Sequence, residues 1–141
     1  MTKRILGVDL GDVRTGLAVS DVLGFMASGI GYEKNQNITE AAKKVTSVAL
    51  EYDVCKIVVG LPVNMNGTEG PRAEKVRKFA EILGKMTKLP IELFDERCTT
   101  MSAHVYLNET NIKSKKRKGV IDTLSAQIIL QNYLDSHKNQ L

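Results

Sequence analysis

Acidic residues stand at three places in this sequence where the surrounding pattern predicts the end of a strand or the start of a helix. Asp9 follows the apolar run 5–8, Asp95 and Glu96 follow a second run, and Asp122 lies early in a predicted C-terminal helix. Carboxylates are costly to bury unless a cation or a proton donor meets them. If the three sites converge, their oxygen-only ligands favour a hard divalent ion, Mg²⁺ or Mn²⁺.

Such a metal centre suits the hydrolysis of phosphodiester bonds. Two ions about 4 Å apart can activate a water molecule and stabilise the leaving oxygen. The basic segment KSKKRK, residues 113–118, directly precedes Asp122 and contains five of the 20 basic residues, so the rest of the chain has 15 basic against 16 acidic residues. We expect a basic loop that holds a nucleic acid backbone over the site. The alternative is a solvated loop without a partner.

Simpler roles exist for Asp9 and Asp122. Asp9 could form a turn by bonding the backbone of 11–13, and Asp122 could favour the dipole of its helix. Helical spacing, however, places Asp122 on the side of Ala126, Ile129 and Tyr133, so we predict that it faces the sheet. The opposite, polar side of that helix is predicted to consist of Gln127, Gln131 and Asp135.

Apolar runs and helical periodicities alternate along the chain and predict an α/β fold. The expected strands are 5–9, 15–20, 24–32, 54–61 and 91–94. The expected helices are 38–52 after an Asn37 cap, 71–84, a short one from about 99 to 107, and 119–135. The irregular segment 60–70 leaves the carboxyl end of a buried strand, where open sheets place their sites.

Composition sets the broad class of the protein. The 141 residues are 43% hydrophobic and 26% charged, with no repeat or linker, so we expect a single domain over 1–141. No apolar run approaches the about 18 residues that span a bilayer. Cys55 and Cys98 are too far apart to form a metal-type pair, which favours a reduced, cytoplasmic protein.

Four segments resemble, in order and spacing, the motifs of the YqgF family: GVDLGDVRTGLAVSD, VVGLPVNMNGTEGPRAEKV, FDERCTT and KKRKGVIDTLSAQIILQNYL. This resemblance covers nearly the whole chain. It implies an RNase H-like fold, a five-stranded mixed sheet with helices on both faces. It also implies a divalent-metal nuclease that trims the 5′ end of the small-subunit ribosomal RNA precursor, in a family also described as Holliday junction resolvases.

The resemblance carries site residues over to this sequence. Asp9, Glu96 and Asp122 match the family's acids, which implies catalytic and metal-binding roles with Mg²⁺ or Mn²⁺. Either Asp95 or Glu96 could be the ligand. The predicted substrate-binding residues are Arg14, Arg97, Thr99, Lys115, Lys116, Arg117 and Lys118. We leave out Asp12, a variable turn position, and we expect packing or surface roles for Cys98, His104 and His137. Ser125 replaces a more usual alanine, a small-for-small change.

Three other readings compete with ribosomal RNA processing. The same acids could cut branched DNA, since they grip phosphates rather than bases; a resolvase would need two sites and a stable dimer. The Asp-x-Gly motif also opens sugar kinases and actin-like ATPases, which use two such domains where this chain supplies one. Finally, the chain could be an idle RNA-binding assembly factor. We expect a nucleic acid partner, no membrane, and a monomer or weak homodimer.

Overall fold

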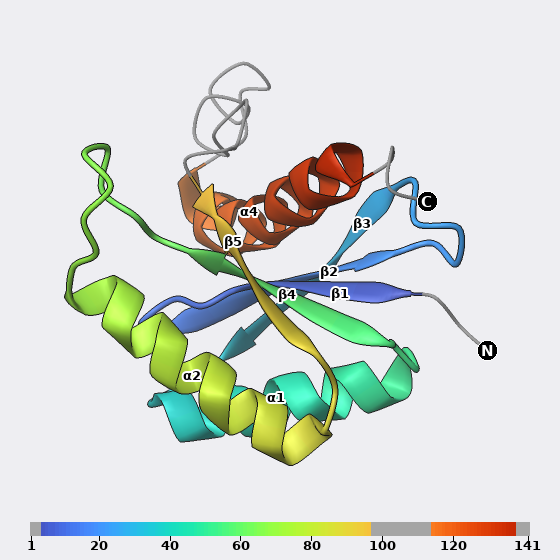
Figure 1. Ribbon diagram of the computed structural model, residues 1–141, viewed down its shortest axis with the longest axis horizontal. Coiled ribbons are helices and arrows are strands. Elements are labelled where there is room, and N and C mark those ends of the chain that lie inside the picture. Colours follow the sequence, from blue (N-terminus) through green and yellow to red (C-terminus); the bar gives the residue numbers. More distant parts are fainter. Residues whose placement is uncertain (1–3, 97–113, 138–141) are drawn as a thin grey trace.

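The computed structural model describes residues 4–96 and 114–137 of the chain, with a five-stranded mixed sheet at its centre (Figure 1). The strands are β1 Ile5–Asp9, β2 Arg14–Ser20, β3 Ala27–Lys34, β4 Lys56–Leu61 and β5 Ile91–Asp95. Their order across the sheet is β3-β2-β1-β4-β5. β2 is antiparallel to β1 and β3, whereas β4 is parallel to both β1 and β5. The carboxyl ends of β1, β3, β4 and β5 therefore share one edge.

Helices cover both faces of this sheet, as expected (Figure 1). The helix α1, Ile38–Glu51, and the helix α2, Pro71–Thr87, lie side by side on one face, and α4, Ser114–Ser136, lies on the other. The core between the sheet and α1 and α2 includes Leu6, Val8, Ile57, Val59 and Phe79. The core beneath α4 includes Val58, Ala126, Ile129, Leu130 and Tyr133. Within the described ranges, no helix is both long and apolar enough to cross a membrane.

The predicted start of α1 is confirmed. The Glu40 amide donates to Asn37 Oδ1 at 2.8 Å, which satisfies one free donor of the first turn. The Gln36 amide donates to Glu40 Oε1 at 3.2 Å, one residue before the amide that the capping box predicts as the donor. This cap places the start of α1 directly after β3, at the shared edge of the sheet.

The predicted irregular segment is also confirmed. It begins where β4 ends at Leu61 and leads to α2 at Pro71. Its turn closes with a bond from the Gly67 amide to the Asn64 carbonyl at 2.8 Å. Two bonds of 2.7 Å from Arg77 to Glu69 fasten the segment to α2. The segment therefore delivers the chain to the first turn of α2, where Pro71 needs no amide donor.

The expectation that residues 113–118 form a loop is wrong for the part of that segment that the structure describes. α4 begins at Ser114, so Lys115, Lys116, Arg117 and Lys118 belong to its first turns. Lys and Arg are good helix formers, and the one interior glycine, Gly119, costs a helix only about 1 kcal/mol. The helix therefore extends five residues before the predicted start at 119.

Other boundaries differ from the predictions by one to three residues. β3 begins at Ala27 rather than 24, because the Asp21 carboxylate accepts from the Phe25 amide at 2.8 Å and holds a turn there. β4 begins at Lys56 rather than 54. α2 continues past Gly84 to Thr87 and ends where Lys88 adopts a left-handed conformation with φ 59°. The short helix predicted near 99–107 lies outside the described residues.

The prediction of a solvated polar side on α4 is wrong for its two glutamines. Gln127 Nε2 donates to the Ala27 carbonyl at 3.1 Å, and Gln131 Oε1 accepts from the Ala27 amide at 2.9 Å. Gln131 Nε2 also donates to the Phe25 carbonyl at 3.0 Å. These side chains satisfy backbone groups at the start of the edge strand β3, a demand that helical periodicity does not reveal.

Candidate active site

Two carboxylates from different strands meet at the shared edge of the sheet, on the face that α4 covers. Asp9 is the last residue of β1, and Glu96 directly follows β5. Their side chains are hydrogen-bonded to each other. Burial, reinforced by the negative charges of Glu96 and Asp122, raises the pKa of Asp9 to about 7. Burial also raises the pKa of Glu96. Asp9 and Glu96 are here called the carboxylate pair, and Asp9 gives up its proton only as the pH rises through about 7.

Geometry places Glu96 rather than Asp95 beside Asp9, because alternate residues of a strand face opposite sides of a sheet. Phe94 contacts Tyr133 of α4 edge to face, with ring centroids 5.8 Å apart. Glu96 follows two residues later and reaches Asp9 on that face. Asp95, the last residue of β5, acts on Glu96 through its charge, which raises the pKa of Glu96.

Gly60 of β4 makes room for the Glu96 side chain. The sequence analysis did not predict Gly60 as a residue of the site. A Cβ atom at this position would lie 2.6 Å from Glu96 Oε1 and 2.6 Å from Ile129 Cδ1, closer than real contacts. A glycine within a buried apolar run is the available signal, since it marks a close approach by another group.

We expect Gly60→Ala to displace the Glu96 carboxylate and to lower any metal-dependent cleavage at least about 10-fold. Overpacking of this kind typically costs about 1–3 kcal/mol of stability. Gly84→Ala in α2 is the matched control, since its new Cβ would meet only Ile91 Cγ1 at 3.3 Å and alanine favours a helix interior. Melting temperature and cleavage rate are measured on both variants. Full cleavage by Gly60→Ala would show that the position of Glu96 is unimportant.

Asp122 faces the sheet as predicted, but its nearest partner is a cation. Its carbonyl oxygen would lie 1.8 Å from a Cβ at Gly16, so α4 rests directly on β2 at this point. Gly16 is the register partner of Asp9, which brings the two acids near each other. Arg14 Nε donates to Asp122 Oδ2 at 2.7 Å, and these side chains are only 25% and 22% exposed. Asp122 still acts on Asp9 through its charge.

The carboxylate pair has the chemistry of a divalent metal site. Two largely buried carboxylates with raised pKa values are an unfavourable arrangement that a divalent cation relieves, and oxygen ligands suit Mg²⁺ or Mn²⁺. Among the described residues, no three His, Cys, Asp or Glu side chains are grouped closely enough to hold a metal ion. The structure therefore unites Asp9 with Glu96 and leaves Asp122, the third predicted ligand, on Arg14.

Arg72, in the first turn of α2, was missed by the sequence interpretation. Its positive charge lowers the pKa of Asp9, of Glu96 and of the turn residue Asp12. It is exposed, so its guanidinium is available to an anionic ligand beside the carboxylate pair. Two signals were available in the sequence: Arg72 lies within the quoted motif VVGLPVNMNGTEGPRAEKV, and it stands in the first turn of the helix that follows the irregular segment 60–70.

Only some of the remaining predicted residues lie within the described part of the chain. Arg97, Thr99, Cys98 and His104 lie outside the described residues, and the backbone of 115–118 lies in α4. His137 does have a partner: its ring stacks on Tyr133 with centroids 4.1 Å apart. Tyr133 in turn donates to Glu92, which pairs with Lys56 at 2.8 Å. This cluster lies where β4 and β5 begin, away from the carboxylate pair.

Comparisons with known proteins agree with this architecture. Residues 3–136 match the family model described as RuvX: Holliday junction resolvase. A protein of Ruminiclostridium cellulolyticum, named "Putative pre-16S rRNA nuclease", is 45% identical over 133 residues, which are 94% of each chain. A protein of Caldanaerobacter subterraneus subsp. tengcongensis with the same name is 47% identical over 137 residues, 96% of this chain and 99% of the relative.

Solved structures show the same fold at low sequence identity. RuvC of T. thermophilus in complex with a Holliday junction substrate has a TM-score of 0.61 at 14% identity, over 96% of each chain. The fowlpox virus Holliday junction resolvase has a TM-score of 0.51 at 14% identity, over 98% of this chain and 99% of the other. The predicted RNase H-like fold is thereby confirmed.

Proposed function

This chain belongs to the RuvX family, the YqgF family of the sequence comparison, and we propose on that premise that it is a divalent-metal-dependent nuclease that processes the 5′ end of the small-subunit ribosomal RNA precursor. The observation that supports this most directly is the carboxylate pair at the carboxyl edge of the sheet. The proposed substrate is taken from the names of the relatives, which refer to a pre-16S rRNA nuclease. We further propose a single domain that acts in the cytoplasm, with nucleic acid as its partner.

In this proposal, Asp9 and Glu96 hold the metal, and Asp122 joins them when it leaves Arg14. When bound, Mg²⁺ or Mn²⁺ supplies an activated water and stabilises the charge that develops on phosphate oxygens. Arg14 on β2 pairs with Asp122, and Arg72 in the first turn of α2 acts through its charge on Asp9 and Glu96. Guanidinium groups bind phosphate oxygens in a bidentate manner, so the two arginines orient the strand across the site.

The test compares two substrates on one preparation. Purified protein is incubated with Mg²⁺ or Mn²⁺ and either a ribosomal RNA precursor that retains its 5′ leader or a synthetic four-way DNA junction. We expect metal-dependent cleavage of the RNA and an intact junction. Thermal unfolding with and without Mn²⁺ provides a second readout, since an ion that binds only the folded state raises the melting temperature.

The family model's own description keeps one alternative open, a resolvase of branched DNA. Cleavage of the junction but not of the RNA, together with a stable dimer in solution, would favour it. If neither substrate is cut with either metal while RNA still binds, the protein is an assembly factor without catalysis, and the proposed activity is wrong.

The basic start of α4 is expected to contribute affinity without specificity. Replacing Lys115, Lys116 and Arg117 by glutamine should weaken binding to RNA and DNA alike. Each lost phosphate contact should flatten the dependence of log K on log salt by about 0.7 to 0.9. The matched control replaces Lys43, Lys85 and Lys88 by glutamine, which removes the same charge from α1 and the far end of α2. Equal affinity and salt slope in the two triple variants would show that 115–117 is a solvated basic segment.

A further inference from the structure

We propose that a groove between the first turns of α1 and α2 binds the phosphate backbone of the substrate strand where it passes beyond the carboxylate pair. This inference rests on the proposed function, since it takes the substrate to be a nucleic acid. It adds a binding surface on the face of the sheet opposite α4. We call this surface the α1–α2 groove.

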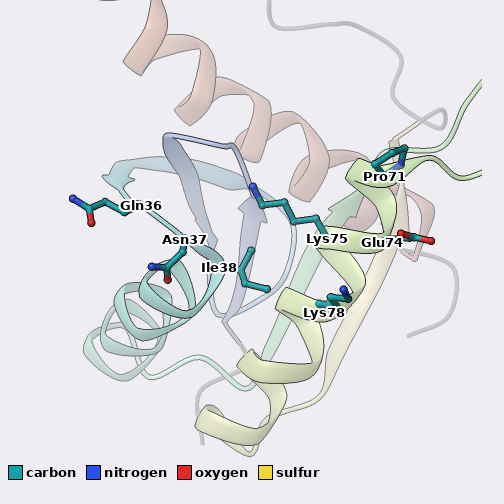
Figure 2. A pocket seen from close by; sticks show the side chains of 7 residues that line it. All are labelled: Gln36, Asn37, Ile38, Pro71, Glu74, Lys75 and Lys78. Carbon is teal, nitrogen blue, oxygen red and sulfur yellow. The ribbon is translucent and has the colours of Figure 1, made fainter.

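The α1–α2 groove has the size for a phosphate and part of a nucleotide, about 370 Å³ (Figure 2). Ile38 lies between the two helices, and Lys75 extends from α2 across the space. The polar lining comprises Gln36, Asn37, Glu74, Lys75 and Lys78.

The charge of the groove favours an anion, since two lysines face one glutamate. Within the described residues, Lys78 makes no ion pair. Lys75 Nζ pairs with Asp12 Oδ1 at 3.0 Å, but the two side chains are 41% and 75% exposed. Such an exposed pair is weak and readily exchanged for a phosphate oxygen. Gln36 and Asn37, which directly precede α1, add side-chain amide donors on the α1 side of the groove (Figure 2).

The groove and the carboxylate pair lie at the same end of the sheet, because α1 follows β3 and α2 follows β4 where β1 ends in Asp9. Arg72, Lys75 and Lys78 are spaced three residues apart on α2, so each is a neighbour of the next. Arg72 is close enough to act electrostatically on Asp9, Glu96 and Asp12. This row of cations joins the site to the groove. A continuous row of this kind suits a strand better than a separate small anion.

The experiment measures the binding of labelled single-stranded RNA in EDTA, over a series of salt concentrations. We expect the double variant Lys75→Gln with Lys78→Gln to bind about 10-fold more weakly at moderate salt. Its salt slope should fall by about 1.4, the value for two contacts on a single strand. The matched control is Lys85→Gln with Lys88→Gln at the other end of α2, and we expect it to bind like the wild type. Melting temperatures of all variants are recorded.

Asp12→Asn separates binding from a structural role of the Lys75–Asp12 pair. If Lys75 binds phosphate, removing its protein partner should leave RNA affinity equal or higher. If the pair merely holds the β1–β2 turn in place, Asp12→Asn and Lys75→Gln should weaken binding alike, and the inference is wrong. Inorganic phosphate that stabilises the wild type but not the double-lysine variant, with unchanged RNA affinity, would also overturn it, since the groove would then take only a small anion.

Failure of this inference can be distinguished from failure of the proposed function. A wild-type protein that binds neither RNA nor DNA contradicts the proposed function itself. A wild-type protein that binds and cleaves RNA, while the double-lysine variant equals its control, contradicts only the groove.

Discussion

Asp9→Asn is expected to reduce metal-dependent cleavage by at least about 100-fold, the loss typical of removing one electrostatic stabiliser from an active site. The same substitution should leave the metal-free protein at pH 8 as stable as the wild type or more stable. Asn keeps the size of Asp9 and a hydrogen bond to Glu96, but removes a largely buried charge beside two other acids. Loss of activity would thus accompany a gain in stability, which few structural roles produce.

The pH dependence gives this prediction a sign. The pKa of Asp9 is raised from 3.8 to about 7 in the folded protein. Between these values the folded carboxyl retains a proton that the unfolded chain has released, so its contribution to stability is full below 3.8 and is lost as the pH rises through about 7. The difference in melting temperature between Asp9→Asn and the wild type, measured in EDTA, should therefore grow in favour of the variant from pH 4 to pH 8.

Metal affinity should rise with pH, whereas the stability contribution of Asp9 falls, because a metal ion displaces the proton that Asp9 carries at low pH. Mn²⁺ affinity of the wild type should rise as the pH passes about 7. Asp12→Asn, which alters an exposed carboxylate in the adjacent turn, serves as the control and should change neither trend. A metal-free Asp9→Asn variant clearly less stable than the wild type at pH 8 would instead assign Asp9 to the turn-forming role.

Local sequence signals predicted much of this fold because they act within a few residues. The alternation of apolar runs and helical periods gave the five strands and the two helices α1 and α2, and Asn37 marked the start of α1. The inward side of α4 also followed from spacing, so Asp122 was expected to face the sheet. These predictions needed no knowledge of which elements are neighbours.

The remaining features depend on contacts between residues far apart in the chain. Gln127 looked like a solvated residue, but the edge of β3, 100 residues earlier, offers it a backbone partner. Gly60 was only one residue of a predicted buried strand, and nothing nearby in the sequence shows that Glu96 and Ile129 occupy the space above it. Arg72 lies within one of the four family motifs, but its nearness to Asp9 and Glu96 depends on where the segment 60–70 places the start of α2. Single-residue types do not encode such neighbours.

The pairing of Arg14 with Asp122 is the contact that most changes the interpretation of the site. The two residues are 108 positions apart, and the bond between them is 2.7 Å long. It presents two possible roles for Asp122: a metal ligand that Arg14 restrains, or an anchor that positions Arg14 for the substrate. The first is the proposal made above.

We expect Asp122→Asn to reduce cleavage at least about 100-fold while RNA affinity and folding are kept. The isosteric amide still accepts a hydrogen bond from Arg14, but it lacks the charge that a divalent ion needs. Arg14→Gln should act differently, with weaker substrate binding and a smaller loss of cleavage. Rates, RNA affinity and melting temperature are measured on the same preparations of both single variants and the double variant.

The direction in which each variant changes Mn²⁺ affinity then distinguishes the two roles of Asp122. If Asp122 is a ligand, Asp122→Asn weakens Mn²⁺ binding, whereas Arg14→Gln strengthens it by removing the cation that competes for the same carboxylate. If Asp122 only anchors Arg14, neither variant changes Mn²⁺ affinity, both lose the same activity, and the double variant loses no more than either one. A collapsed melting temperature in Asp122→Asn would make its role structural, because the packing of α4 on β2 at Gly16 would then depend on the charge itself.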